Sequence, residues 1–210
     1  MTNTPYGRIT AGLIGMWFVF CAVGSALHIF WSDASHPPIA LGLAVLTPII
    51  VFALWSAASE GFRQFTRSLS PRALTSVHAW RIAGFAFLVA YAYGKLPAVF
   101  AFPAGFGDIA IGATALWAAK RLATPEHRGG FMLWQALGTL DLVTAVTVGT
   151  TATFLFPHGI PTSAVTVLPL SLIPTFAVPL LTILHFICIG QARQWPVAVS
   201  HHGQPRHAEA

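Results

Sequence analysis

The chain has 210 residues, of which 55% are hydrophobic and 8% are charged, and its formal net charge is +5. The mean hydropathy is +0.70, which is typical of a protein that lives in a lipid bilayer. The basic residues are scattered among short segments between long apolar stretches, so a water-soluble nucleic-acid-binding protein is excluded. We therefore expect the bilayer as a partner and no nucleic acid.

Long apolar stretches fill most of the chain, and each is long enough for a membrane-spanning helix of roughly 20 residues. The predicted spans, in chain order, are 11–31, 39–58, 76–95, 98–119, 131–156 and 164–190. The predicted fold class is all-α, a polytopic membrane bundle of six transmembrane helices. We expect one transmembrane domain over 1–195 and a disordered polar tail over 196–210.

Prolines predict broken helices at the second and sixth spans. Pro48 lies in the middle of the second span, and the sixth is preceded and interrupted by Pro169, Pro174 and Pro179. Each of the last three frees the carbonyl four residues earlier. Those carbonyls belong to Val165, Leu170 and Thr175. At membrane depth a freed carbonyl is tolerated only where it faces protein or a wet cavity, so we expect one of these two surroundings at each site.

The longest polar segment, 59–75, connects the second and third spans. Its apolar residues Phe62, Phe65 and Leu69 recur at helical spacing among arginines. That pattern fits a short interfacial helix and equally fits an ordinary basic loop.

The loops predict the orientation of the bundle. The basic residues gather before the first span, after the sixth, and in the loops that follow spans two and four, whereas 32–38 and 157–163 contain no Lys or Arg. The positive-inside rule then places both termini in the cytoplasm, in a bacterial inner membrane. Cys21 and Cys188 lie inside spans and have no partner spacing, so neither a disulfide nor a metal site is expected.

Asp108 is an acidic residue inside the fourth span, where a lone charge is unfavourable. Small residues share its helix face and allow another helix to approach. They are Gly105, Gly112 and Ala115. If the helix starts at Pro103, Asp108 lies about 8 Å below the outer surface. We expect it to form an outer polar cluster with Lys95 and His28, and the alternative is a structural role with Lys95 as its counter-ion.

Asp141 lies deeper, roughly 15 Å into the fifth span and near the midplane. Its face also carries small or polar residues and should meet protein. They are Gly138, Thr144 and Ala145. Arg81 and His185 are its natural partners by depth. Such a group would be a proton-accepting site or an anion site, and the alternative is an ion pair that only fixes helix packing.

Histidines allow a second interpretation. His78 and His185 lie near the inner ends of spans three and six, where they could serve as axial ligands of one haem b. No spacing on two helices forces this pairing, so no cofactor is expected under the leading hypothesis.

The run from Arg81 to Leu88, followed by Lys95 and then Gly105 and Gly112, resembles the DoxX-like membrane proteins over spans three to five. Those proteins show a similar pattern of arginine, glycine and lysine and are associated with redox enzymes. The resemblance implies a redox-linked role. The chain departs from the pattern by two additional helices and by an aspartate where a glutamate is expected. More broadly, it resembles uncharacterised multi-pass proteins of bacterial inner membranes.

These residues lead to one leading hypothesis and two alternatives. The leading one is a small proton-linked carrier or permeation pathway for a small solute, with Asp141 as the protonatable group. Arg81 and His185 would tune it or bind the solute, and Asp108 with Lys95 would act at the outer gate. The alternatives are a redox-associated subunit that binds haem b or quinone, and a non-catalytic assembly subunit of a homo-oligomer or larger membrane complex. The sequence contains no GxSxG, HExxH or P-loop motif, which favours a non-enzymatic role.

Overall fold

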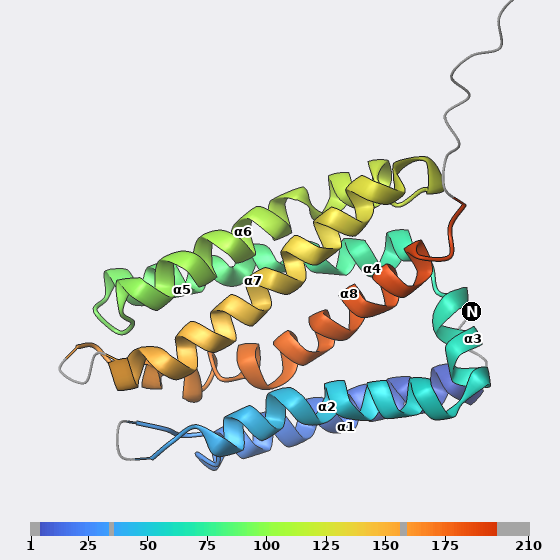
Figure 1. Cartoon of the computed structure of the whole chain (residues 1–210). Coiled ribbons are helices and arrows are strands. Elements are labelled where there is room, and N and C mark those ends of the chain that lie inside the picture. The colour runs from blue at the N-terminus through green and yellow to red at the C-terminus, as the bar shows by residue number, and fades with distance from the viewer. Residues whose placement is uncertain (1–4, 34–35, 156–158, 197–210) are drawn as a thin grey trace, which may run out of the picture.

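The computed structural model describes residues 5–33, 36–155 and 159–196, and this part of the chain is built from helices and contains no strand. The long helices run back and forth along one direction (Figure 1). In chain order the elements are α1 (Pro5–Ala26), α2 (Ile39–Ala58), α3 (Glu60–Ser68), α4 (Pro71–Val77), the 3₁₀ segment η1 (His78–Gly84), α5 (Phe85–Ala92), α6 (Ala98–Arg121), η2 (Pro125–His127), α7 (Arg128–Leu155), η3 (Thr162–Thr166), the π-helical segment η4 (Ile173–Ala177) and α8 (Val178–Ala192).

Six helical segments in this part of the chain are long and apolar enough to cross a membrane. They are Pro5–Ala26, Ile39–Ala58, Pro71–Ala92, Ala98–Arg121, Pro125–Ala152 and Ile173–Ala192. The predicted all-α fold with six spans is therefore confirmed. Large apolar side chains on their outer faces remain exposed, such as Met16 at 65% and Leu43 at 61%. Because these faces need apolar surroundings, the protein is a multi-pass membrane protein in contact with lipid.

The first span ends five residues before its predicted end. After Ala26 the chain forms a Schellman turn, in which the Ile29 amide donates to the Gly24 carbonyl at 2.9 Å and the His28 amide to Ser25 at 3.1 Å. His28 has a positive φ of 59°, in the position where glycine is usual. Apolar residues continue past this turn, so hydropathy alone extends the span too far.

The third span is composite. It begins at Pro71, where Ser70 caps the helix by accepting a hydrogen bond from the Ala73 amide. It ends in a second Schellman turn around Gly94, whose φ is 65°. The sequence does not predict the 3₁₀ segment between α4 and α5. With three residues per turn, this segment places His78, Arg81 and Gly84 in one row, and all three are buried.

α6 begins at Ala98, after Pro97 as its cap, and Pro103 lies inside the helix. The expectation that the helix starts at Pro103 is therefore wrong. Asp108 lies roughly 15 Å along the helix from Ala98, so it is well inside the span and not near its outer end.

Proline has its predicted effect at the start of the sixth span, but the predicted break in the second span is wrong, because α2 continues through Pro48. Pro179 cannot donate to the Thr175 carbonyl, and two side chains of α1 take its place. Trp17 Nε1 donates to that oxygen at 3.0 Å and Cys21 Sγ at 3.3 Å. The freed carbonyl thus faces protein, as membrane depth requires, and it anchors α1 to η4. The span itself begins at Ile173, nine residues after the predicted 164–190 start.

The basic segment after α2 contains the short helix α3, so the helical interpretation of this segment is confirmed. Ser59 caps it by accepting from the Phe62 amide at 3.2 Å. Phe62 is buried and stacks on Trp55 with ring centroids 4.0 Å apart. On the exposed face, hydrogen bonding from Arg63 lowers the pKa of Glu60 below its ordinary value.

Both ends of the described chain lie at the same end of the bundle, together with α3 and the turn between α6 and α7 (Figure 1). The corners between α1 and α2, between α5 and α6, and after α7 lie at the opposite end. The predicted tail over 196–210 lies outside the described residues except for Pro196. This arrangement defines two ends of the bundle, which we call the terminal end and the corner end.

Candidate functional site

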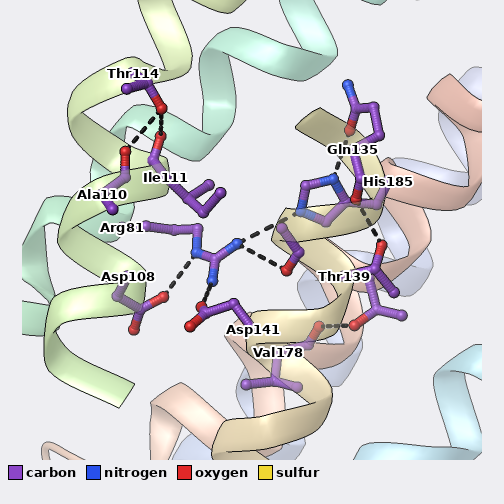
Figure 2. Close-up of polar contacts among 12 residues, drawn as sticks. Arg81, Asp108, Ala110, Ile111, Thr114, Gln135, Thr139, Asp141, Val178 and His185 are labelled. Atoms are coloured by element: carbon purple, nitrogen blue, oxygen red, sulfur yellow. Dashed lines mark hydrogen bonds and ion pairs between the residues drawn. The ribbon is translucent and has the colours of Figure 1, made fainter. Parts of the chain in front are cut away.

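Arg81 is the centre of a buried ionic cluster (Figure 2). Its side chain is 1% exposed. The Nε atom donates to Asp108 Oδ1 at 2.7 Å, and Nη2 donates to Asp141 Oδ2. The three side chains come from η1, α6 and α7, so one guanidinium joins three spans. We call Arg81, Asp108, Asp141 and His185 the Arg81 cluster.

The third guanidinium nitrogen is also used within the protein. Nη1 donates to the Gly138 carbonyl at 3.3 Å and lies 3.5 Å from Nε2 of His185 on α8. The structure therefore places Arg81, Asp141 and His185 in contact and adds Asp108 to them. Each nitrogen of Arg81 already has a protein acceptor, and two carboxylates surround the guanidinium, so the arrangement does not fit an anion site.

The charges of the cluster do not balance when all its ionic groups are charged. One guanidinium faces two carboxylates, whose side chains are only 11% and 16% exposed. Charge–charge energies are large where water is scarce, so one uncompensated negative charge is strongly unfavourable there. Uptake of one proton or one cation would restore neutrality.

Glycines make this close grouping possible. A methyl group at Gly84 would overlap Asp108, and one at Gly107 would overlap Asp141. A methyl at Gly112 would overlap the backbone of η1 beside Arg81, so α6 approaches η1 with no side chain between them. Small residues at helix contacts allow such an approach, and here they set the distance between the arginine and its carboxylates.

A polar chain continues from His185 toward the terminal end. His185 Nδ1 lies 2.5 Å from Gln135 Oε1, and Gln135 Nε2 donates to Thr75 Oγ1 at 3.1 Å. Because the Gln135 amide nitrogen is directed at Thr75, its oxygen accepts from His185 Nδ1–H. Nε2 of His185 is then an acceptor for Arg81. Sequence reasoning missed Gln135 and Thr75, although a lone glutamine three residues before Gly138 was a usable signal.

The histidine pair does not fit a haem. The rings of His78 and His185 stack with centroids 4.0 Å apart and planes inclined by 26°. Axial ligands must aim nitrogens at an iron from opposite sides, with the porphyrin between the rings. Stacked rings leave no space for it. Within the described residues, neither ring nitrogen of His78 has a hydrogen-bond partner.

The predicted outer cluster of Asp108, Lys95 and His28 is not formed. Lys95 and His28 are exposed at the corner end, each in the turn that ends its helix. Asp108 is buried against Arg81. The error comes from the assumed start of α6, which placed Asp108 too close to the corner end.

A cavity of about 70 Å³ leads to the cluster from the corner end. Its lining begins at Ser32 and Pro38, before α2, and reaches Arg81 and Asp108. Its walls are mostly apolar. They include Phe87, Phe100, Leu142 and Val146. His78, His185 and Gln135 are not among the lining residues of the described chain, so they lie on the other side of Arg81.

Removing the guanidinium tests the charge balance. Arg81→Met should lower the free energy of unfolding by about 3–5 kcal/mol, because two buried carboxylates lose their counter-ion. The triple variant that adds Asp108→Asn and Asp141→Asn should recover much of that loss. Unfolding in mixed detergent micelles measures both, with Lys95→Met as an exposed control expected within about 0.5 kcal/mol of the parent. A triple variant no more stable than Arg81→Met contradicts the charge argument.

Gly138 provides a steric test of the same region. A methyl group there would lie 2.5 Å from Nε2 of His185, so Gly138→Ala should displace the ring and cost about 1–3 kcal/mol. Gly190→Ala in α8 is the matched control, because no atom lies within 4 Å of its added methyl. Equal thermal stabilities of the two variants in detergent would mean that His185 does not occupy this position.

The comparisons with known proteins give one match. A family model described as Domain of unknown function (DUF8737) matches residues 37–193. The search of curated proteins and the search of solved structures gave no match. The matched range includes α2 to α8 and every member of the Arg81 cluster, and it leaves α1 outside. Because the match covers most of the chain, the protein belongs to the DUF8737 family.

Proposed function

We propose that this protein is a small proton-linked carrier for a small solute, and that the Arg81 cluster is its coupling site. The observation that carries the proposal is the pair of carboxylates that share one buried arginine at the end of a cavity. Ionisable groups inside membrane spans commonly mark solute or proton pathways. When one carboxylate of this pair takes up a proton, the other remains ionised and still neutralises Arg81.

The residues of the cluster take different roles in this proposal. Asp141 is the group that gains and loses the proton, and Asp108, which lines the cavity, meets the solute. Arg81 holds both carboxylates in place, and His185 fixes the far side of the guanidinium. Lys95 has no role, because it is exposed at the corner end.

The sixth span supplies a point at which the bundle could change shape. The cavity wall includes Ile173, Pro174 and Ala177 of η4 and Val178 of α8. π-helical turns and prolines interrupt the regular hydrogen bonds of a helix, and interrupted helices commonly form transporter sites. Movement at this segment would close the cavity toward the corner end and open the cluster toward the terminal end.

The proposed orientation follows from the basic residues. Those of α3, of the segment that follows it and of the end of α6 lie at the terminal end. They are Arg63, Arg67, Arg72, Lys120 and Arg121. The positive-inside rule places this end in the cytoplasm of a bacterial inner membrane, with the cavity facing outward.

A redox role, which the resemblance to DoxX-like proteins implies, is not proposed. The stacked rings of His78 and His185 do not fit a haem. An assembly subunit would use the cluster for packing only, and the experiment below separates that role from transport.

Replacement of the protonatable group tests the carrier. In proteoliposomes with an internal pH dye, a panel of small solutes is added under a pH gradient. At least one should move protons in the parent, and Asp141→Asn should reduce that rate at least tenfold because the coupling proton has no acceptor. The variant should still fold, since Arg81 and Asp108 remain a neutral pair.

Glu60→Gln is the matched control, because this carboxylate is exposed on α3 and should not affect the rate. Proton movement in Asp141→Asn at the parental rate would refute the mechanism. Absence of solute-driven proton movement in the parent would favour the assembly role.

A further inference from the structure

We infer that the solute is a small amphipathic organic cation, of the alkylammonium class, which replaces the proton at the Arg81 cluster. This inference rests on the proposed function and names the chemistry of its solute. Four features of the cavity and the cluster support it.

The first feature is the acceptor atom left free at the inner end of the cavity. Arg81 has used each of its nitrogens on protein acceptors. Asp108 lines the cavity, and its Oδ2 atom has no donor among the described residues. The unused carboxylate oxygen of Asp108 is an acceptor, so a solute that binds beside it gains hydrogen bonds by bringing N–H or O–H donors.

The second feature is the net charge. With both carboxylates ionised, the cluster has one negative charge more than Arg81 neutralises. A solute with one positive charge removes this excess and gains charge-assisted hydrogen bonds. An anion would add to the excess, and a neutral solute would leave it unchanged.

The third feature is the wall of the cavity. Phe87 and Phe100 from two different spans line it together with aliphatic side chains of α7. Such walls bind an alkyl chain, and aromatic faces also attract a cation. A bare metal ion requires several oxygen ligands, whereas most residues of these walls are apolar. The volume of about 70 Å³ restricts the solute to a short chain.

The fourth feature is competition with the proton. One excess charge accepts one proton or one monovalent cation, and both together would leave the buried cluster positive. The titratable group that contacts both carboxylates is Arg81 on η1, and His185 on α8, against which His78 stacks, lies on the far side of the guanidinium. α2 and η3, which also line the cavity, contain none. Binding of the cation should therefore release one proton, and a cycle should exchange one cation for one proton.

The test uses the full chain in detergent and measures binding of n-butylammonium by isothermal titration calorimetry. n-Butanol and butyrate are the neutral and anionic probes of similar size, and potassium and ammonium are the inorganic cations. We expect n-butylammonium to bind at least tenfold more tightly than any of the four. Its affinity should fall as the pH is lowered, by up to about tenfold per unit, because one proton competes.

Asp108→Asn should lower the affinity for n-butylammonium at least tenfold, while the neutral pair of Arg81 and Asp141 keeps the protein folded. Glu60→Gln is the control and should bind as the parent does. Butanol or butyrate that binds as tightly as n-butylammonium would overturn the inference. Potassium or ammonium that binds as tightly would also overturn it, in favour of an inorganic-cation site.

The binding and transport experiments can refute the cation site and the carrier independently of each other. Binding of n-butylammonium that depends on Asp108, without proton movement in proteoliposomes, would support the cation site and contradict the carrier. Proton movement that depends on Asp141 but is driven only by neutral or anionic solutes would overturn the cation site and leave the carrier standing.

Discussion

The structure depends on one electrostatic constraint. The charges of one guanidinium and two carboxylates must neutralise one another in a region from which water is largely excluded. Arg81 meets it with hydrogen bonds to Asp108 and Asp141 on two neighbouring spans. Such a pairing requires short distances between helices, and glycines at the contacts supply them. The 3₁₀ segment η1 also helps to bring these groups together. With three residues per turn, His78 and Arg81 lie on the same face of the segment and both point into the bundle.

The two sides of Arg81 differ, and the difference gives the cluster a direction. Toward the corner end lies a cavity with apolar walls, at whose inner end Asp108 is available. Toward the terminal end, His185, Gln135 and Thr75 form a hydrogen-bonded chain that belongs to the packed interior. A site open on one side and closed on the other is what alternating access requires of one of its states. The irregular start of the sixth span forms part of the cavity wall, so a change in its shape would act directly on the site.

Hydropathy predicted the six spans, because a membrane-crossing helix needs a continuous apolar stretch of a set length, which can be read directly from the sequence. Depth along the spans also predicted that Arg81 and His185 lie near Asp141. The depth of Asp108 was wrong because it was counted from Pro103, whereas α6 begins at Ala98, and a shift of five residues moves a side chain by roughly 8 Å. The 3₁₀ turn escaped prediction because its apolar residues fit an α-helix equally well. The stacked rings of His78 and His185 are a tertiary contact, which no spacing in one helix reveals.

The central claim is that the two carboxylates share one arginine and together take up one proton. Infrared difference spectroscopy of the membrane-embedded protein during a pH titration tests it directly, because protonated carboxyl groups away from water have a distinct stretching band. The account predicts one such band with the intensity of one group in the parent, and its loss in Asp141→Asn, where Arg81 and Asp108 form a neutral pair. Two independent bands, or one band that persists in Asp141→Asn, would contradict it.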